Sequence, residues 1–152
     1  MKRFLKESIK LISSAFYVGY LPCFPGTWAS LLAIGLYLLV QKDILLYLTL
    51  TLTILCLGFL TSGKAEEIWG RKDPPMVVID EIGGMLIALF LLPPSIPLIG
   101  ITFLLFRFLD ISKISPVEIE RWKGSKGIMA DDIWAGVITN LIMQVVQRMC
   151  RW

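Results

Sequence analysis

The stretch GIMADDIWAGVITNLIMQVV, residues Gly127–Val146, joins two adjacent carboxylates to a segment apolar enough for a hydrocarbon environment. Helix capping explains one Asp here, because Asp is a favoured N-cap and negative charge stabilises a helix N-terminus. The second carboxylate needs another explanation, since neighbouring helical residues point about 100° apart and rarely serve one ligand equally. We therefore expect one of Asp131 and Asp132 to cap the helix or support a ligand, and the other to bind an ion.

The composition of the 152-residue chain is that of a membrane protein. Hydrophobic residues make up 56% of the chain, which is above the roughly 45–50% of soluble domains. The net charge of +3 is small and the basic residues form no dense stripe, so nucleic-acid binding has no support. No internal repeat or linker divides the sequence, and we predict a single domain over residues 1–152.

The apolar runs predict an all-α fold, a compact multi-helix membrane bundle. They cover residues 28–40, 44–60, 82–92, 96–106 and 133–146. Only Ile44–Leu60 approaches the lower limit of about 17 apolar residues for a spanning helix. The other segments are short transmembrane or re-entrant helices, and they need polar extensions or cover from their neighbours.

The N-terminal residues 1–20 predict an amphipathic helix that is retained in the protein, because Glu7 and Lys10 interrupt any signal-peptide core. Its apolar side carries four residues at helical spacing, Leu5, Ile9, Ile12 and Phe16. We expect this helix to lie at a membrane surface or against the bundle.

The Lys and Arg residues predict the orientation in the membrane. If all five segments cross, most basic residues fall on one side, in the stretches 1–27, 61–81 and 107–132. That side is cytoplasmic by the positive-inside rule. The same alternation brings all the acidic motifs to this side, with the residues Asp80, Glu81, Asp110, Asp131 and Asp132.

The residue types available restrict any metal site to oxygen ligands. The chain has no histidine, which removes the commonest metal ligand and the commonest general base. Its three cysteines, Cys23, Cys56 and Cys150, lack the paired spacing of a zinc site or a disulfide framework. Oxygen ligands favour Mg²⁺, Ca²⁺ or Mn²⁺.

The stretch MVVIDEIGGMLIALF, residues 76–90, places Asp80 and Glu81 inside an apolar run. Charges in such a setting are usually paired, bound to an ion or functional. The alternative is that both lie among lipid headgroups and simply begin the helix. Gly83 and Gly84 would let a second helix or a ligand approach closely.

The stretch FRFLDISKISP, residues 106–116, spaces Arg107, Asp110 and Lys113 three apart along one side of a helix that Pro116 is expected to end. An internal ladder of ion pairs is one interpretation. A cation and carboxylate array that holds a phosphate and its metal ion is the other.

The stretch GYLPCFPGTWAS, residues 19–30, is a Pro/Gly turn before a helix for which Thr27 is the expected N-cap. Besides forming this turn and helix start, the backbone and hydroxyl groups of Gly26, Thr27 and Ser30 at a helix N-terminus could bind a phosphate oxygen. The spacing of a nucleotide P-loop is absent, so ATP binding has no support.

Together, PGTWAS, VVIDEIGGM, FRFLDISKISP and GIMADDIWAG resemble the phosphatidylglycerophosphatase A family, in order and over nearly the whole chain. The resemblance implies an Mg²⁺-dependent lipid phosphatase that converts phosphatidylglycerophosphate to phosphatidylglycerol at the cytoplasmic face of the bacterial inner membrane. It implies metal ligands at Asp80, Glu81, Asp131 and Asp132, and a catalytic role for these four and Asp110. It also implies that Arg107 and Lys113 contact the phosphate.

The residues independently narrow the mechanism of a phosphatase. Without histidine there is no histidine phosphatase, no Cys is followed by Arg six positions later, and no D-x-D occurs. A water molecule activated by a metal ion is favoured over a carboxylate nucleophile. A small cation transporter or channel component is the alternative function, because carboxylates within a membrane also mark ion pathways. The oligomeric state is left open.

Overall fold

The computed structural model describes residues 2–113, 116 and 122–150. In chain order its elements are α1 (Lys2–Ser13), the 3-10 helix η1 (Val18–Tyr20), α2 (Pro25–Val40), α3 (Ile44–Trp69), α4 (Ile79–Leu89), α5 (Ile96–Ile111) and α7 (Ser125–Cys150). No β-strand occurs among the described residues, which confirms the all-α prediction.

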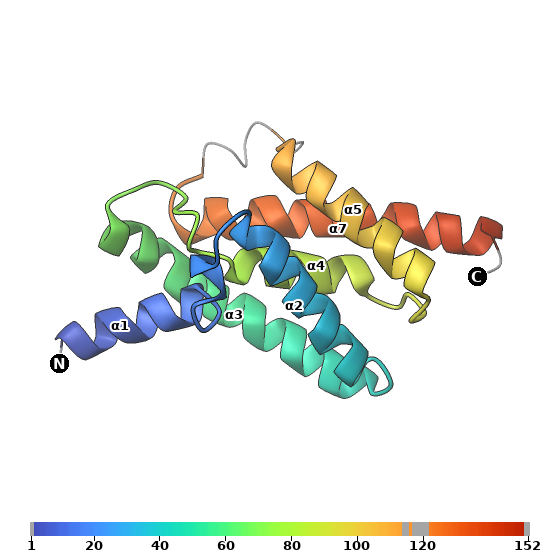
Figure 1. Ribbon diagram of the computed structural model, residues 1–152, viewed down its shortest axis with the longest axis horizontal. Helices are drawn as coiled ribbons and strands as arrows, with labels where there is room; N and C mark the ends of the chain where they lie inside the picture. The colour runs from blue at the N-terminus through green and yellow to red at the C-terminus, as the bar shows by residue number, and fades with distance from the viewer. Residues whose placement is uncertain (1, 114–115, 117–121, 151–152) are drawn as a thin grey trace.

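Helix α4 lies at the centre of the bundle, where it packs against α2, α3, α5 and α7 (Figure 1). Almost all of its residues are buried, which explains why its sequence is apolar on every side. Its 11 residues extend only about 16 Å, which is too short to cross the hydrocarbon of a bilayer. Neighbouring helices therefore cover α4, as expected for the short segments.

Helices α3 and α7 are long and apolar enough to cross a membrane, by length and composition, and α2 is a shorter apolar helix. Large apolar side chains remain exposed on the outer faces of all three, among them Leu39, Leu45, Leu52 and Leu141. An exterior of this kind is expected for helices that face lipid, and it is unusual for a soluble monomer.

The N-terminal helix α1 packs against α3. Ile9 is buried and Ile12 is half-buried, whereas Leu5 is exposed and Phe16 follows the end of the helix on the surface. The amphipathic helix is therefore confirmed, but only the middle two residues of its expected apolar side meet the bundle.

Three helix boundaries differ from those expected. Helix α2 begins at Pro25 after Phe24, so the prediction that Thr27 is its N-cap is wrong. Helix α5 ends at Ile111, before Pro116, because Lys113 already has a left-handed φ of 47°. Helix α7 begins at Ser125, so Asp131 and Asp132 lie inside it and neither caps it.

The C-terminal end of α4 is buried, and side chains of other helices bind the carbonyl groups there. The donors and acceptors are Tyr47 to Leu86, Asn140 to Ala88 (3.0 Å) and Phe90 (2.7 Å), Gln144 to Phe90 (3.1 Å) and Tyr37 to Leu92 (2.7 Å). The last carbonyl groups of a helix have no partner within it. These polar side chains, placed in otherwise apolar helices, therefore make the burial of α4 possible.

Candidate metal centre

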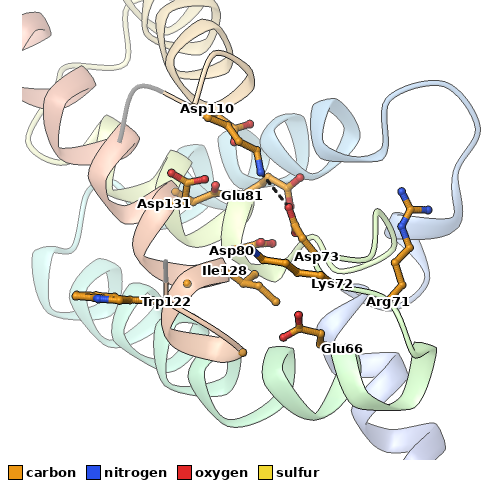
Figure 2. A pocket seen from close by; sticks show the side chains of 14 residues that line it. Glu66, Arg71, Lys72, Asp73, Asp80, Glu81, Asp110, Trp122, Ile128 and Asp131 are labelled. Atoms are coloured by element: carbon orange, nitrogen blue, oxygen red, sulfur yellow. Dashed lines mark hydrogen bonds and ion pairs between the residues drawn. The ribbon is translucent and has the colours of Figure 1, made fainter. Parts of the chain in front are cut away.

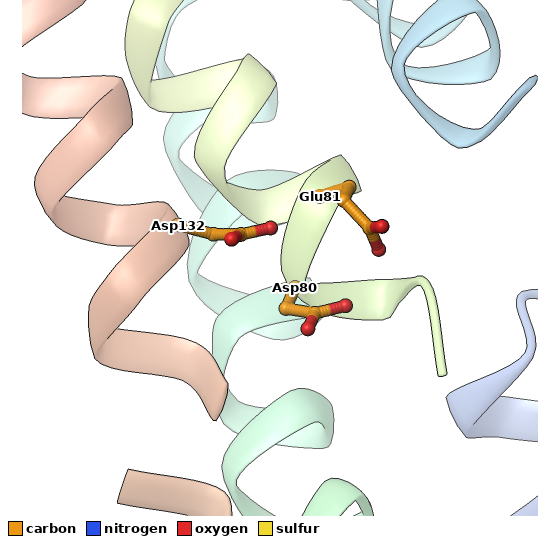
Figure 3. A group of neighbouring side chains, drawn as sticks. All are labelled: Asp80, Glu81 and Asp132. Atoms are coloured by element: carbon orange, nitrogen blue, oxygen red, sulfur yellow. The ribbon is translucent and has the colours of Figure 1, made fainter. Parts of the chain in front are cut away.

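The first turn of α4 carries Asp80 and Glu81, and α7 carries Asp132 beside them (Figure 3). One carboxylate oxygen from each of the three lies within 4.8 Å of the other two. Asp80 and Asp132 are each only 5% exposed. Residues about fifty positions apart in the chain thus form one compact group of oxygen donors.

A close crossing of α4 and α7 brings these carboxylates together. A Cβ atom on Gly136 would overlap with the backbone of Gly84, and one on Gly84 would overlap with the carbonyl oxygen of Asp132 and the ring of Phe106. Glycine is needed at both positions, because any side chain would push the two helices apart. The sequence prediction that Gly84 permits a close approach is therefore confirmed.

The group has oxygens that no described residue satisfies. Asp80 Oδ1, Glu81 Oε2 and Asp132 Oδ2 are buried and have no hydrogen-bond partner among the described residues. Leaving a buried polar atom without a partner is costly, and such atoms usually indicate a bound ion or water. Oxygen donors of this kind and number fit a hard divalent cation such as Mg²⁺.

Two of these carboxyl groups lie outside both candidate membrane-spanning helices, and their pKa values are raised. Burial and then the charge of Glu81 raise the pKa of Asp80 well above its ordinary value. Burial and then the charge of Asp132 raise the pKa of Glu81 to about 8. Crowded carboxylates repel one another when ionised, and a cation among them would remove that repulsion.

Arg107 and Asp110 form an ion pair at the end of α5, with Arg107 Nη1 2.5 Å from Asp110 Oδ2. Their side chains are 13% and 16% exposed. A Cβ atom on Gly26 would overlap with Glu81 Oε1 and with the Arg107 guanidinium, so the start of α2 lies against both. Asp110 also lines the pocket described below, whereas Arg107 is not among its lining residues. Arg107 therefore lies behind the carboxylates.

The start of α2 supports the group without opening into the pocket. Gly26 is buried, the backbone N–H of Thr27 donates to Phe24 O (2.9 Å), and the Ser30 hydroxyl donates to Gly26 O (2.9 Å). None of the three lines the pocket. In this structure these contacts hold the first turn of α2.

A pocket of about 550 Å³ opens over the carboxylates (Figure 2). Its lining residues are Glu66, Arg71, Lys72, Asp73, Asp80, Glu81, Asp110, Lys113, Trp122, Gly124, Gly127, Ile128, Asp131 and Asp132. All five carboxylates expected from the sequence are among them. Lys113 is there too, with its Nζ 3.3 Å from Asp73 Oδ2 in an exposed ion pair.

The sequence analysis missed the contribution of the connection between α3 and α4. Arg71 and Lys72 contributed only to the predicted membrane orientation, and no role was predicted for Asp73. All three line the pocket. Asp73 has a left-handed φ of 49°, a conformation that costs energy and is often kept at functional sites. The available signal was a short charged connection, GRKDPP, directly before the acidic motif.

Comparison with known proteins identifies relatives over most of the chain. A family model described as Phosphatidylglycerophosphatase A matches residues 11–147. The chain is 37% identical to a Bacteroides thetaiotaomicron protein named "Putative phosphatidylinositol-3-phosphatase", over 90% of the chain and 92% of that protein. It is 32% identical to phosphatidylglycerophosphatase A of Haemophilus influenzae (94% and 91% covered) and 34% identical to that of Escherichia coli (90% and 81% covered). No solved structure matches the chain.

Proposed function

Because the chain belongs to the phosphatidylglycerophosphatase A family, we propose that this phosphatase converts phosphatidylglycerophosphate to phosphatidylglycerol and phosphate with the help of Mg²⁺. The observation that carries the proposal is the trio of carboxylates, each with one buried oxygen that has no hydrogen-bond partner among the described residues. The relative named for an inositol lipid would also act on a phosphomonoester of a phospholipid headgroup, so the reaction type is common to all three relatives.

Asp80, Glu81 and Asp132 are the residues that would hold the ion. When bound there, a divalent cation supplies the positive charge that polarises a phosphoryl group and acidifies water. Lys113 at the pocket offers donors to the phosphate oxygens and offsets the negative charge that develops on them. Asp110 and Asp131 line the same pocket and are the carboxylates available to orient the attacking water and accept its proton.

We place the pocket at the cytoplasmic face of the inner membrane, in a chain that crosses the bilayer several times. Helices α2, α4 and α7 begin at the pocket end of the bundle, and α3 and α5 end there, as expected for alternating segments (Figure 1). Most Lys and Arg residues fall in the stretches 1–27, 61–81 and 107–132, which reach this end, and this supports the orientation.

The cation-transport alternative is less well supported. Three of the residues that line the pocket are basic, Arg71, Lys72 and Lys113. Fixed positive charges at the mouth of a site suit an anionic substrate and oppose the passage of cations.

The test is phosphate release from phosphatidylglycerophosphate in neutral detergent micelles, with Mg²⁺ and with EDTA. We expect EDTA to abolish release and Mg²⁺ to restore it. Asp80→Asn and Asp132→Asn should lower kcat by at least about 100-fold, because even the outer partners of metal ligands are worth about 10–100-fold. Glu7→Gln, an exposed carboxylate on α1 that lies outside this pocket, is the control and should retain activity. Release that persists in EDTA, or equal loss in all three variants, would contradict the proposal.

A further inference from the structure

A second depression, of about 680 Å³, adjoins the carboxylate pocket. The two share Glu66, Arg71, Lys72 and Gly124 in their linings, so they are continuous. The first is lined by most of the acidic residues of the site, whereas the second carries Lys123 in addition to Arg71 and Lys72. The second depression also holds Glu66 and Glu67, so its three cations outnumber its carboxylates, whereas carboxylates outnumber the cations in the first.

The cations of the second depression are free to bind an anion. Arg71, Lys72 and Lys123 are exposed, and none of them forms an ion pair with a described residue. Arg71 lies at the edge of the first pocket, on the same connection as Lys72 and Asp73 (Figure 2). Guanidinium and ammonium groups form charge-assisted hydrogen bonds with phosphate oxygens, and Arg can use two of its donors at once.

The second depression lies nearer the end of the bundle than the carboxylate trio does. It is lined by Gly63 and Gly124, and the backbone N–H of Gly63 donates to Ser125 Oγ (2.8 Å) at the first residue of α7. Asp132 is seven residues further along α7, which is about 10 Å at the rise of an α-helix. A ligand that places one phosphate on the trio and extends toward this end of the bundle would reach the second depression.

We propose that Arg71, Lys72 and Lys123 form a second phosphate subsite, which binds the phosphodiester of a lipid whose terminal phosphomonoester occupies the carboxylate pocket. The inference rests on the proposed function for the identity of the first phosphate. It adds the residues that would distinguish this lipid, which has two phosphates joined by a short polyol, from lipids whose single phosphate is the monoester. The two phosphates of the substrate are then bound by two different parts of one continuous cavity.

The kinetic test compares two lipids in neutral detergent micelles: phosphatidylglycerophosphate, and a diacylglycerol 3-phosphate that lacks the phosphodiester. The double variant Arg71→Gln/Lys72→Gln should raise KM for the first lipid by about fivefold to tenfold, as expected for screened charge-assisted hydrogen bonds, and leave its kcat unchanged. KM for the second lipid should rise much less, because it loses only the general attraction of two cations that also line the carboxylate pocket. Lys64→Gln is the matched control, because Lys64 is exposed on α3 and lines neither depression.

Two results would overturn the subsite. One is an equal rise in KM for both lipids, which would indicate general attraction of anionic lipid. The other is an equal effect of Lys64→Gln, which would indicate a loss of overall positive charge.

A binding measurement separates failure of the subsite from failure of the proposed function. Phosphatidylglycerol carries the phosphodiester alone, and its equilibrium binding to the protein in neutral micelles requires no hydrolysis. We expect the double variant to bind it about fivefold to tenfold more weakly than the wild type and Lys64→Gln do. If the wild-type protein released no phosphate from the lipid, the proposed function would be wrong. The binding of phosphatidylglycerol would still test the subsite. Equal binding by all three proteins would refute the subsite.

Discussion

Gly84 and Gly136 lie backbone against backbone, one helical turn beyond Asp80 on α4 and one turn beyond Asp132 on α7. Residues four apart on a helix lie on the same face. Each glycine therefore sets the distance between the helices on the very faces that carry the carboxylates. The geometry of the candidate metal centre depends on two residues that have no side chain.

Gly136→Ala should separate α4 from α7 and lower both stability and activity. Overpacking of this kind typically costs about 1–3 kcal/mol of stability. The displacement of Asp132 should also weaken the Mg²⁺ dependence of activity, by more than the loss of folded protein explains. Gly35→Ala on α2 is the matched control, because nothing lies within 4 Å of its added Cβ. The control should stabilise the protein by up to about 1 kcal/mol through helix propensity. Thermal unfolding and an Mg²⁺ titration of activity check both; similar behaviour of the two variants would contradict the role of the crossing.

Arg107→Gln should act mainly on kcat and stability, because Arg107 pairs with Asp110 and, like Glu81, lies against Gly26, and it does not line the pocket. Breaking a buried ion pair from one side costs up to about 3–5 kcal/mol, since it leaves an unpaired buried charge. The double variant Arg107→Gln/Asp110→Asn removes both charges and should recover part of that stability. Unfolding and KM with the proposed substrate are the measurements. A large rise in KM with unchanged stability would instead make Arg107 a phosphate ligand, as the sequence suggested.

Asn140→Leu should destabilise the bundle by about 1–3 kcal/mol, because two buried carbonyl groups at the end of α4 would lose a donor. Thr139→Val on the preceding residue is the control. The Thr139 hydroxyl is buried and has no hydrogen-bond partner among the described residues, so its removal should be neutral or stabilising. Chemical or thermal unfolding in detergent distinguishes the two. Equal effects would mean that packing volume, and not hydrogen bonding, decides stability here.

The native cysteines can test the proposed orientation. Cys23 precedes α2 at the pocket end, Cys150 ends α7 at the other end, and both are exposed. In single-cysteine variants, a membrane-impermeant maleimide should label Cys23 only in inside-out vesicles and Cys150 only in right-side-out vesicles. Cys56, in the middle of α3, should react poorly in both because lipid covers it. Labelling of Cys23 and Cys150 from the same side would refute the alternating topology.

The sequence predicted the helices well where composition alone decides them, and less well at their ends. The apolar run 44–60 identified α3, but the helix continues to Trp69 because its last turns pack one side and expose Lys64 and Glu67. The cap expected at Thr27 was wrong, and so was the capping alternative for Asp131 or Asp132. Local propensity favours capping at these positions, but tertiary packing lets the helices begin earlier.

For the site, the sequence identified the residue types and the structure supplied the directions. The spacing of Arg107, Asp110 and Lys113 correctly indicated one region, but helical spacing cannot show that Arg107 lies behind the pocket while Lys113 lines it. The roles of Asp73, Arg71 and Lys72 depend on how the connection before α4 folds over the pocket. Irregular backbone of this kind, including the left-handed Asp73, has no periodic pattern from which its path can be inferred.

The burial of α4 has a consequence for how the protein is made. An 11-residue helix with two carboxylates in its first turn is a poor substrate for insertion into lipid on its own. It must be accommodated together with its neighbours, and Asp132 arrives on α7, which is synthesised after α4 and α5. A nascent chain that stops short of α7 therefore has no complete ion-binding group and leaves the α4 carbonyl groups without Asn140 and Gln144. Catalytic competence and escape from membrane quality control should then be acquired in the same late step of biogenesis.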